Sequence, residues 1–201
     1  MYASGLGYEP VVRTVHVGST RIINWTLQRD WAAAAGGAKV ADFSGGDDSS
    51  DGCGPDRLID LSTAAWSSDV VAGTNSAGIA PAHNTVELPR AVDIREVLVD
   101  PTAGCGDDIT SSLGDYRIET SADGTAWTTA AEGHFKPADT GRQNAVSLKA
   151  GTDQDIRYVR LTKLGSQVAD SGQDCAKDST PWGCKFVDTT ELVVLGRPHQ
   201  G

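Results

Sequence analysis

The sequence has no long apolar run and few basic residues. No stretch of about 18 apolar residues occurs, so the sequence predicts no membrane-spanning helix. Lys and Arg number 17 against 27 Asp and Glu, which gives a formal net charge of −10. Binding to nucleic acid or to an anionic membrane needs a basic patch, so this balance argues against both partners. Acidity also keeps secreted proteins soluble and does not by itself indicate a ligand.

The short motifs of common enzyme classes are also missing. The chain contains no His-Glu-x-x-His, no Gly-x-Ser-x-Gly and no phosphate-binding loop. A pair of catalytic carboxylates cannot be assigned from sequence among so many acidic residues. The four histidines show no metal-ligand spacing: His16, His83, His134 and His199. We therefore predict a chain without a catalytic role.

Cysteine usage points to an oxidising compartment. The chain lacks the Cys-x-x-Cys pairs of a zinc ribbon, and its even number of cysteines predicts two disulfides. Three pairings are possible, of which we favour Cys53–Cys105 with Cys175–Cys184. The first residues, Met1 to Gly5, have neither the basic start nor the apolar run of a signal peptide. We therefore expect a piece cut from a longer secreted, extracellular protein.

Short alternating segments separated by turn residues predict an all-β main domain over residues 38–198. Asp123-Gly124 predicts a hairpin turn. An irregularity is expected inside residues 92–99, where the apolar alternation changes phase. Regularly spaced strands of this kind are typical of a sandwich or barrel. Strands are expected at residues 40–43, 85–89, 92–99, 116–121, 145–148, 157–161 and 192–195.

Residues 1–31 have a separate pattern. Two candidate strands, 11–17 and 21–27, flank a Gly18-Ser19 turn, and two strands cannot bury a core of their own. They are expected either to end a preceding β domain or to pack on the main domain. Residues 32–37 are expected to be a link of small residues, and residues 199–201 a tail.

The order of motifs along the main domain resembles the coagulation factor 5/8 type C, or discoidin, family. The likeness covers residues 38–198. It implies a galactose-binding-like jelly-roll β-sandwich, with Trp66 and Trp127 in the core, that binds a ligand and catalyses nothing. The segments that carry it are Ile59-Asp60 with Trp66-Ser67-Ser68, Val86 to Pro89, Ser121 to Trp127, Arg157 to Leu161 and Glu191 to Gly196.

A narrower likeness concerns the cysteine segments. Residues 52–55, residues 104–108 and the loop from Cys175 to Cys184 resemble the discoidin domain at the C-terminal end of secreted actinobacterial metallopeptidases of the fungalysin type. The zinc motif of those enzymes is absent here. The resemblance therefore implies an accessory domain of a peptidase and not the peptidase itself.

The family resemblance also implies a structural calcium site. Calcium prefers about six to eight oxygen ligands. Asp60 and Glu191 would supply carboxylates, and Arg57 and Thr190 would supply backbone carbonyls. Ser62 and Thr63 would complete the shell. This chain departs from the family pattern, since Leu61 replaces a usual Gly and the step from Asp60 to Trp66 is one residue shorter. The alternative is that Asp60 caps its own turn through an Asx hydrogen bond.

In carbohydrate-binding relatives, sugars lie on loops at one end of the sandwich. An aromatic ring stacks on the sugar, and polar side chains bond its hydroxyls. Candidate loops here are 69–84, 102–115 and 163–188. Trp182, flanked by two cysteines, is the expected stacking residue, because a disulfide-pinned side chain loses little entropy on binding. Expected polar contacts are His83, Asp107 and Asp108.

Each of these ligand residues has a structural alternative. Trp182 could pack under its own loop, Asp107 and Asp108 could form a solvated turn, and His83 could be structural. The expected function is that of a binding module in a secreted bacterial enzyme. The module would bind carbohydrate of a cell wall or an extracellular polymer. The alternative function is a protein-interaction or structural domain that docks on its parent peptidase or on a protein substrate.

Overall fold

The computed structural model describes residues 1–15, 18, 22, 24–69 and 81–201. Its helical segments are short 3₁₀ turns, and no helix among these residues is long and apolar enough to cross a membrane. The strands are β1 (Tyr2–Gly5), β2 (Tyr8–Val12), β3 (Lys39–Phe43), β4 (Trp66–Asp69), β5 (Ala82–Asp100), β6 (Asp115–Ser121), β7 (Thr128–His134), β8 (Asn144–Val146), β9 (Ile156–Lys163), β10 (Phe186–Thr189) and β11 (Glu191–Pro198). The 3₁₀ turns are η1 (Ala34–Gly36), η2 (Ser49–Asp51), η3 (Pro55–Ile59), η4 (Ile109–Ser111), η5 (Pro137–Asp139) and η6 (Trp182–Cys184).

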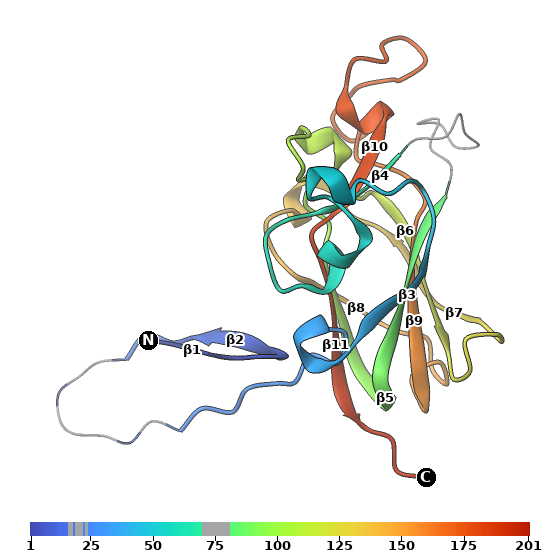
Figure 1. Ribbon diagram of the computed structural model, residues 1–201. Helices are drawn as coiled ribbons and strands as arrows, with labels where there is room; N and C mark the ends of the chain where they lie inside the picture. Colours follow the sequence, from blue (N-terminus) through green and yellow to red (C-terminus); the bar gives the residue numbers. More distant parts are fainter. Residues whose placement is uncertain (16–17, 19–21, 23, 70–80) are drawn as a thin grey trace.

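The 19-residue strand β5 contributes to both layers of the molecule (Figure 1). Its first half pairs with β3 and β9, and its second half pairs with β11 and β8. The register shifts between Glu87 and Val92, a stretch that includes Pro89, which has no N–H to donate. Strands that bend at such points pass from one sheet to the other. The predicted all-β sandwich is therefore confirmed.

Alternating side chains of the two layers form one hydrophobic core. Trp66 is fully buried in it, as predicted. The prediction that Trp127 lies in the core is wrong, because this residue follows the Asp123-Gly124 turn and is only partly buried. Its ring packs against the Arg160 guanidinium, whose Cζ lies 3.9 Å from the ring centroid. Core residues include Leu58, Ile59, Val86, Leu88, Val97, Val99, Ile118, Val159, Leu161, Leu192 and Val194.

The expected strands 85–89 and 92–99 are the two halves of β5. The irregularity expected in the second half is present, since the register between β11 and β5 shifts at Leu195/Gly196 opposite Ile94 and Glu96. The sequence did not indicate β4, β7 or β10, because their polar residues show no clear apolar alternation. The Asp-Gly hairpin joins β6 to β7 as expected.

The segment that follows the N-terminal hairpin belongs to the core. Trp31 N–H donates to the Val194 carbonyl at 2.8 Å, and Ala32 and Ala33, expected in a link, are fully buried. Of the expected strands, β2 ends at Val12 instead of reaching residue 17, and residues 22 and 24–27 lie in no strand. Residues 16–17, 19–21 and 23 lie outside the described residues.

Both predicted disulfides are present. Cys53–Cys105 spans 52 residues with its Cα atoms 5.9 Å apart, and Cys175–Cys184 spans 9 residues with its Cα atoms 5.5 Å apart. The first joins the segment before η3 to the loop after β5. The second closes the loop that carries η6.

The two disulfides should stabilise the fold unequally. Replacing Cys53 and Cys105 by Ala should lower the free energy of unfolding by about 4 kcal/mol, and replacing Cys175 and Cys184 by about 2.6 kcal/mol, because closing the longer loop removes more unfolded-chain entropy. Urea titrations of the two double variants under non-reducing conditions measure both losses. A larger loss for the short loop would contradict this order.

Candidate functional site

Two loops pack together at the end of the sandwich where β4 pairs with β10 (Figure 1). Gly183 N–H donates to Thr110 Oγ1 at 2.9 Å, and Ser166 Oγ donates to the Gly183 carbonyl at 2.7 Å. A side chain at Gly183 would overlap the Thr110 carbonyl, so this contact requires glycine. The loop after β5 and the loop closed by Cys175–Cys184 are thereby held as one surface.

A buried lysine supports this surface from below. Lys163 Nζ donates to the carbonyls of Trp66 in β4 and Val187 in β10, each at 2.7 Å, and lies 3.5 Å from the centroid of the Trp66 ring. Burial lowers the pKa of Lys163 well below its ordinary value, and the charge of Asp188 opposes that shift. The sequence analysis missed Lys163, although it alternates with Val159 and Leu161 on the inward face of β9.

A buried carboxyl group, Asp188, acts on this lysine, and a second one, Asp107, lies beside Asp188. Asp188 is fully buried, and its Oδ2 accepts the Gly104 N–H at 3.0 Å. Burial raises the pKa of Asp188, against the favourable charge of Lys163. Burial and then the Asp188 charge raise the pKa of Asp107 to about 7. Asp107 therefore already has a side-chain contact, with Asp188, inside the protein.

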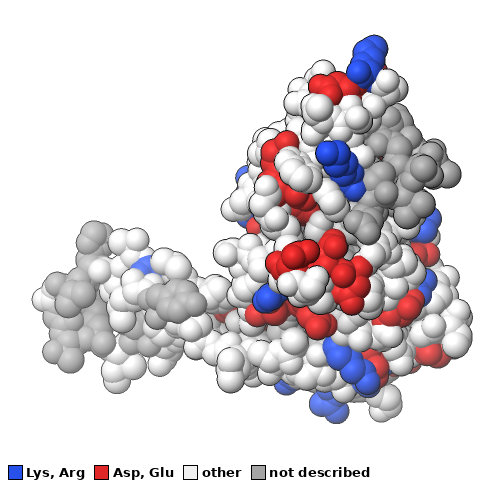
Figure 2. All heavy atoms as spheres, turned by 45° about the horizontal axis from the view of Figure 1, so that its top comes forward, with Lys and Arg blue, Asp and Glu red and all other residues white. Residues whose placement is uncertain are grey.

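Asp108 and Trp182 lie on the same surface. Burial opposes ionisation of Asp108, but the Thr110 hydroxyl and N–H, the latter at 2.8 Å, bind its carboxylate and lower its pKa. The Trp182 ring is 41% exposed and packs on Phe186, with ring centroids 5.7 Å apart. Trp182 is therefore not buried under its loop. Figure 2 turns this end forward and shows Asp and Glu gathered on it in patches.

His83 lies at the start of β5 and has a structural environment. Its Nδ1 is 2.9 Å from Ser44 Oγ, and its Nε2 is 2.8 Å from Asp42 Oδ2, so the ring ties β5 to the β3 segment. Within the described parts of the chain, no hydrogen bond joins it to Trp182, Asp107 or Asp108. Two of the candidate loops, 102–115 and 163–188, contact each other through Thr110 and Gly183. Residues 70–80 of the third candidate loop lie outside the described residues.

The implied calcium ligands near η3 make protein contacts of their own. Asp60 Oδ2 pairs with Arg57 at 2.9 Å, and its Oδ1 accepts the Ser62 N–H at 2.9 Å, so the Asx turn considered as the alternative is present. Leu61 has a φ of +61°, in the left-handed region that glycine adopts easily. The chain therefore keeps the glycine-like backbone conformation despite the substitution.

Glu191 is the buried carboxylate of the calcium set. It is 5% exposed, and neither carboxylate oxygen has a hydrogen bond of normal geometry to another described residue. Burial, followed by the charges of Asp30 and Asp60, raises its pKa to about 10, an effect that the nearby Leu61 N–H only partly offsets. Ser62, Thr63 and Thr190 line the same cleft, whose volume is about 500 Å³.

An unpartnered buried carboxylate fits a metal ligand, because a cation would compensate the charge that burial disfavours. In the described portion of the chain, however, no three His, Cys, Asp or Glu side chains converge in metal-binding geometry. A calcium ion at Glu191 would therefore depend on backbone carbonyls, as the family pattern implies, or on side chains that move toward it.

Solved structures share this fold. They include CBM32-3 from a family 31 glycoside hydrolase of Clostridium perfringens, which is 20% identical over 80% of this chain and 91% of that one, with a TM-score of 0.56. The family 32 carbohydrate-binding module of Streptococcus pneumoniae EndoD is 14% identical over 84% and 99%, with a TM-score of 0.54. CpGH89CBM32-5 of C. perfringens, in complex with GalNAc-β-1,3-galactose, is 18% identical over 79% and 94%, with a TM-score of 0.52.

These similarities define the class of fold as a galactose-binding-like β-sandwich. The family model described as F5/8 type C domain matches residues 41–176, about two thirds of the sequence. The chain therefore belongs to the F5/8 type C domain family. Among curated proteins, none matches the sequence significantly.

Replacing Lys163 by Met should lower the free energy of unfolding by about 3–5 kcal/mol, because it removes a buried charge that compensates Asp188 and leaves two carbonyls without a donor. Urea unfolding followed by Trp fluorescence measures the loss. The double variant Lys163→Met/Asp188→Asn should recover part of it, since no unpaired carboxylate then remains. No recovery in the double variant would show that Lys163 and Asp188 do not interact.

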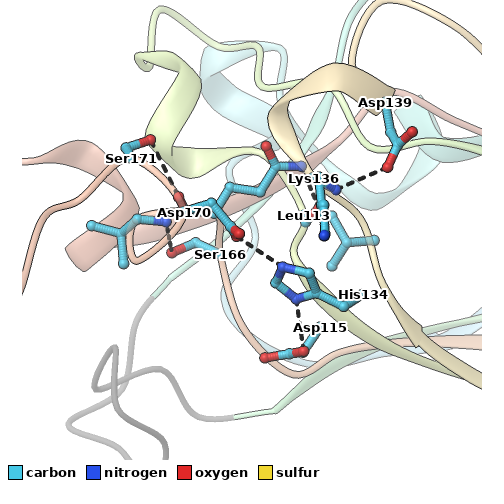
Figure 3. A network of polar contacts seen from close by, with 10 residues as sticks. Leu113, Asp115, His134, Lys136, Asp139, Ser166, Asp170 and Ser171 are labelled. Atoms are coloured by element: carbon cyan, nitrogen blue, oxygen red, sulfur yellow. Dashed lines mark hydrogen bonds and ion pairs between the residues drawn. The ribbon is translucent and has the colours of Figure 1, made fainter.

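His134, at the end of β7, ties the sheet to the loop that contains the short disulfide. Its Nδ1 is 2.8 Å from Asp115 in β6, and its Nε2 is 2.8 Å from Asp170 (Figure 3). Both nitrogens donate only when the ring is doubly protonated. Burial alone would lower the pKa of His134, but the two carboxylates raise it above the ordinary value of 6.5.

Because the folded-state pKa of His134 is raised, its stabilising contribution is complete below the unfolded value of 6.5 and is lost as the pH rises through the folded value. NMR titration of the ring should give a pKa above 6.5, and Asp170→Asn should lower it. Asp93→Asn, which removes the partner of His199 at 2.6 Å, is the matched control and should leave His134 unchanged. An unchanged pKa of His134 in Asp170→Asn would contradict the bridge.

Proposed function

We propose that this chain is a non-catalytic carbohydrate-binding module of a secreted bacterial enzyme and binds glycans of a cell wall or an extracellular polymer. The observation that carries the proposal is the 41% exposed Trp182 ring on a disulfide-closed loop that packs against the loop of Asp107 and Asp108. An exposed ring provides a stacking surface, and neighbouring carboxylates accept hydrogen bonds from sugar hydroxyls. The disulfide limits the entropy that the loop loses on binding.

Similar structures and the disulfides support this proposal. Two of the structures described above are named as carbohydrate-binding modules, and a third was solved with a bound disaccharide. Two disulfides suit an extracellular protein. An exposed site of this kind binds weakly, and tethering to an enzyme compensates by raising the effective concentration at the polymer.

The identity of the parent enzyme is part of the proposal. The cysteine segments of the sequence favour a metallopeptidase, whereas one of the similar modules comes from a glycoside hydrolase. Either parent would use the module in the same way, to keep its catalytic domain near a polymer.

A structural calcium ion at Glu191 is the second part of the proposal. Its support is the pair of buried, unpartnered Glu191 oxygens beside Ser62, Thr63 and Thr190. Bound calcium would supply the missing positive charge and stabilise the folded state by mass action.

Docking on a protein is the second candidate function. Exposed apolar side chains on and beside the N-terminal hairpin favour it: Leu6 is 84% exposed and Val12 is 75% exposed. A parent enzyme domain that covers these residues would remove their apolar surface from water.

A glycan array of the oxidised protein should show binding to one class of sugar, with Trp182→Ala weakening it at least about tenfold because the stacking ring is lost. Trp127→Ala is the matched control, since it removes a half-exposed ring from another surface and should leave glycan binding intact. The melting temperature of Trp182→Ala should stay within about a degree of the parent. A blank array with a folded protein would favour the docking function, and equal losses in both variants would remove Trp182 from the site.

A further inference from the structure

Where the N-terminal hairpin meets the sandwich, four buried carboxylate oxygens have no hydrogen-bond partner in the described part of the chain. They are Glu9 Oε1, Asp30 Oδ2 and both oxygens of Glu191. Glu9 and Glu191 line the same cleft, and Asp30 Oδ1 accepts the N–H of Val194 in the strand that begins with Glu191. Buried carboxyl groups gathered in one place need protons or a cation to compensate the cost of burial.

Backbone contacts fix the three residues relative to each other. Glu9 N–H donates to the Gln28 carbonyl at 2.9 Å, and Asp30 N–H donates to the Gly7 carbonyl at 3.0 Å. Asp30 Oδ1 accepts the Ala32 and Val194 N–H groups, each at 2.9 Å, which anchors this segment to the strand that begins with Glu191. Asp30 therefore links the hairpin to the sandwich, and the backbone hydrogen bonds of the hairpin place Glu9 near this link.

A cleft of about 500 Å³ lies between the hairpin and the sandwich. Glu9 lines it from β2, and Asp100 and Glu191 line it from β5 and β11. No Lys, Arg or His among the described residues lines it. Its other polar walls come from Ser4, Tyr8, Ser62, Thr63, Gln143 and Thr190. The cleft thus offers carboxylate and hydroxyl oxygens without a protein cation to neutralise them.

We propose that one divalent cation, held by Glu9 together with Glu191, clamps the N-terminal hairpin onto the sandwich. The inference rests on the proposed cation at Glu191 and adds Glu9 of the hairpin to its ligands. Among the described residues no three acidic side chains converge in metal-binding geometry, so the remaining ligands would be backbone carbonyls and hydroxyls. Such a mixed oxygen shell suits the flexible coordination of Ca²⁺ better than the strict octahedron of Mg²⁺.

Cation binding and hairpin docking are then coupled. The hairpin contacts the rest of the chain through backbone hydrogen bonds, a side-chain hydrogen bond between Glu9 and Gln143 and a close approach of Gly7 to Gly36. With Ca²⁺ bound, the charge repulsion between Glu9 and Glu191 becomes an attraction through the ion. The hairpin amides should therefore exchange more slowly with Ca²⁺ than without it.

Isothermal titration of the full chain with CaCl₂ tests the proposal. The unsubstituted protein should bind one Ca²⁺, Glu9→Gln should weaken binding about tenfold because one carboxylate ligand is lost, and Glu191→Gln should abolish it. Glu132→Gln, at an exposed position in β7, is the matched control and should bind normally. Hydrogen exchange at the Glu9 and Asp30 amides should slow with Ca²⁺ in the unsubstituted protein but not in Glu9→Gln.

Each other outcome overturns a defined part of the proposal. Normal Ca²⁺ affinity in Glu9→Gln, or hairpin amides that ignore Ca²⁺, would separate the hairpin from the cation site while leaving calcium at Glu191 intact. No Ca²⁺ binding by the unsubstituted protein would overturn both the clamp and the structural calcium. Glycan binding is measured separately, so its failure stays distinguishable. If Glu191→Gln does not fold, Glu9→Gln on the hairpin still decides.

Discussion

The ammonium group of Lys163 joins the seven-stranded sheet to the small sheet of β4 and β10. A buried charge is costly unless partners replace its hydration. Here two carbonyls, the Trp66 ring and Asp188 do so. Their positions set where β4 and β10 lie, and with them the loop of Trp182. The proposed binding surface therefore stands on a charged, hydrogen-bonded support at a place where the apolar core ends.

Buried carboxylates have different neighbours at the loop end of the sandwich and at the N-terminal hairpin. At the loop end, Asp188 has a lysine beside it and a backbone N–H on one oxygen. At the hairpin, no Lys, Arg or His among the described residues lines the cleft of Glu191, and the nearby Leu61 N–H only partly offsets its burial among other acidic groups. The cost of burying a carboxylate charge is thus compensated by protein groups at the loop end. At the hairpin, protons or a bound cation are needed to compensate it. The proposed cation would give the residues before the family domain a role in its stability.

The sequence predicted the features that depend on local pattern. Apolar alternation located most of the strands of the sandwich, Asp123-Gly124 located a hairpin, and the favoured cysteine pairing was correct. It failed where a neighbour distant in sequence decides the environment. Trp127 was placed in the core, yet Arg160 holds its ring on the outer face. The contacts of His83 with Asp42 and Ser44 were likewise not predicted, and its role at a ligand site stays a prediction.

The sequence by itself determined the fold class, because the strand period and turn chemistry are local properties of the chain. It also supplied Trp182 on a disulfide-closed loop. Only the tertiary structure decided which charges are buried and what lies next to them. Lys163 and Glu191 look like ordinary polar residues in sequence. Burial makes one a support for the loops and leaves the other without a partner, because the cost of a buried charge depends on neighbours that only the folded chain assembles.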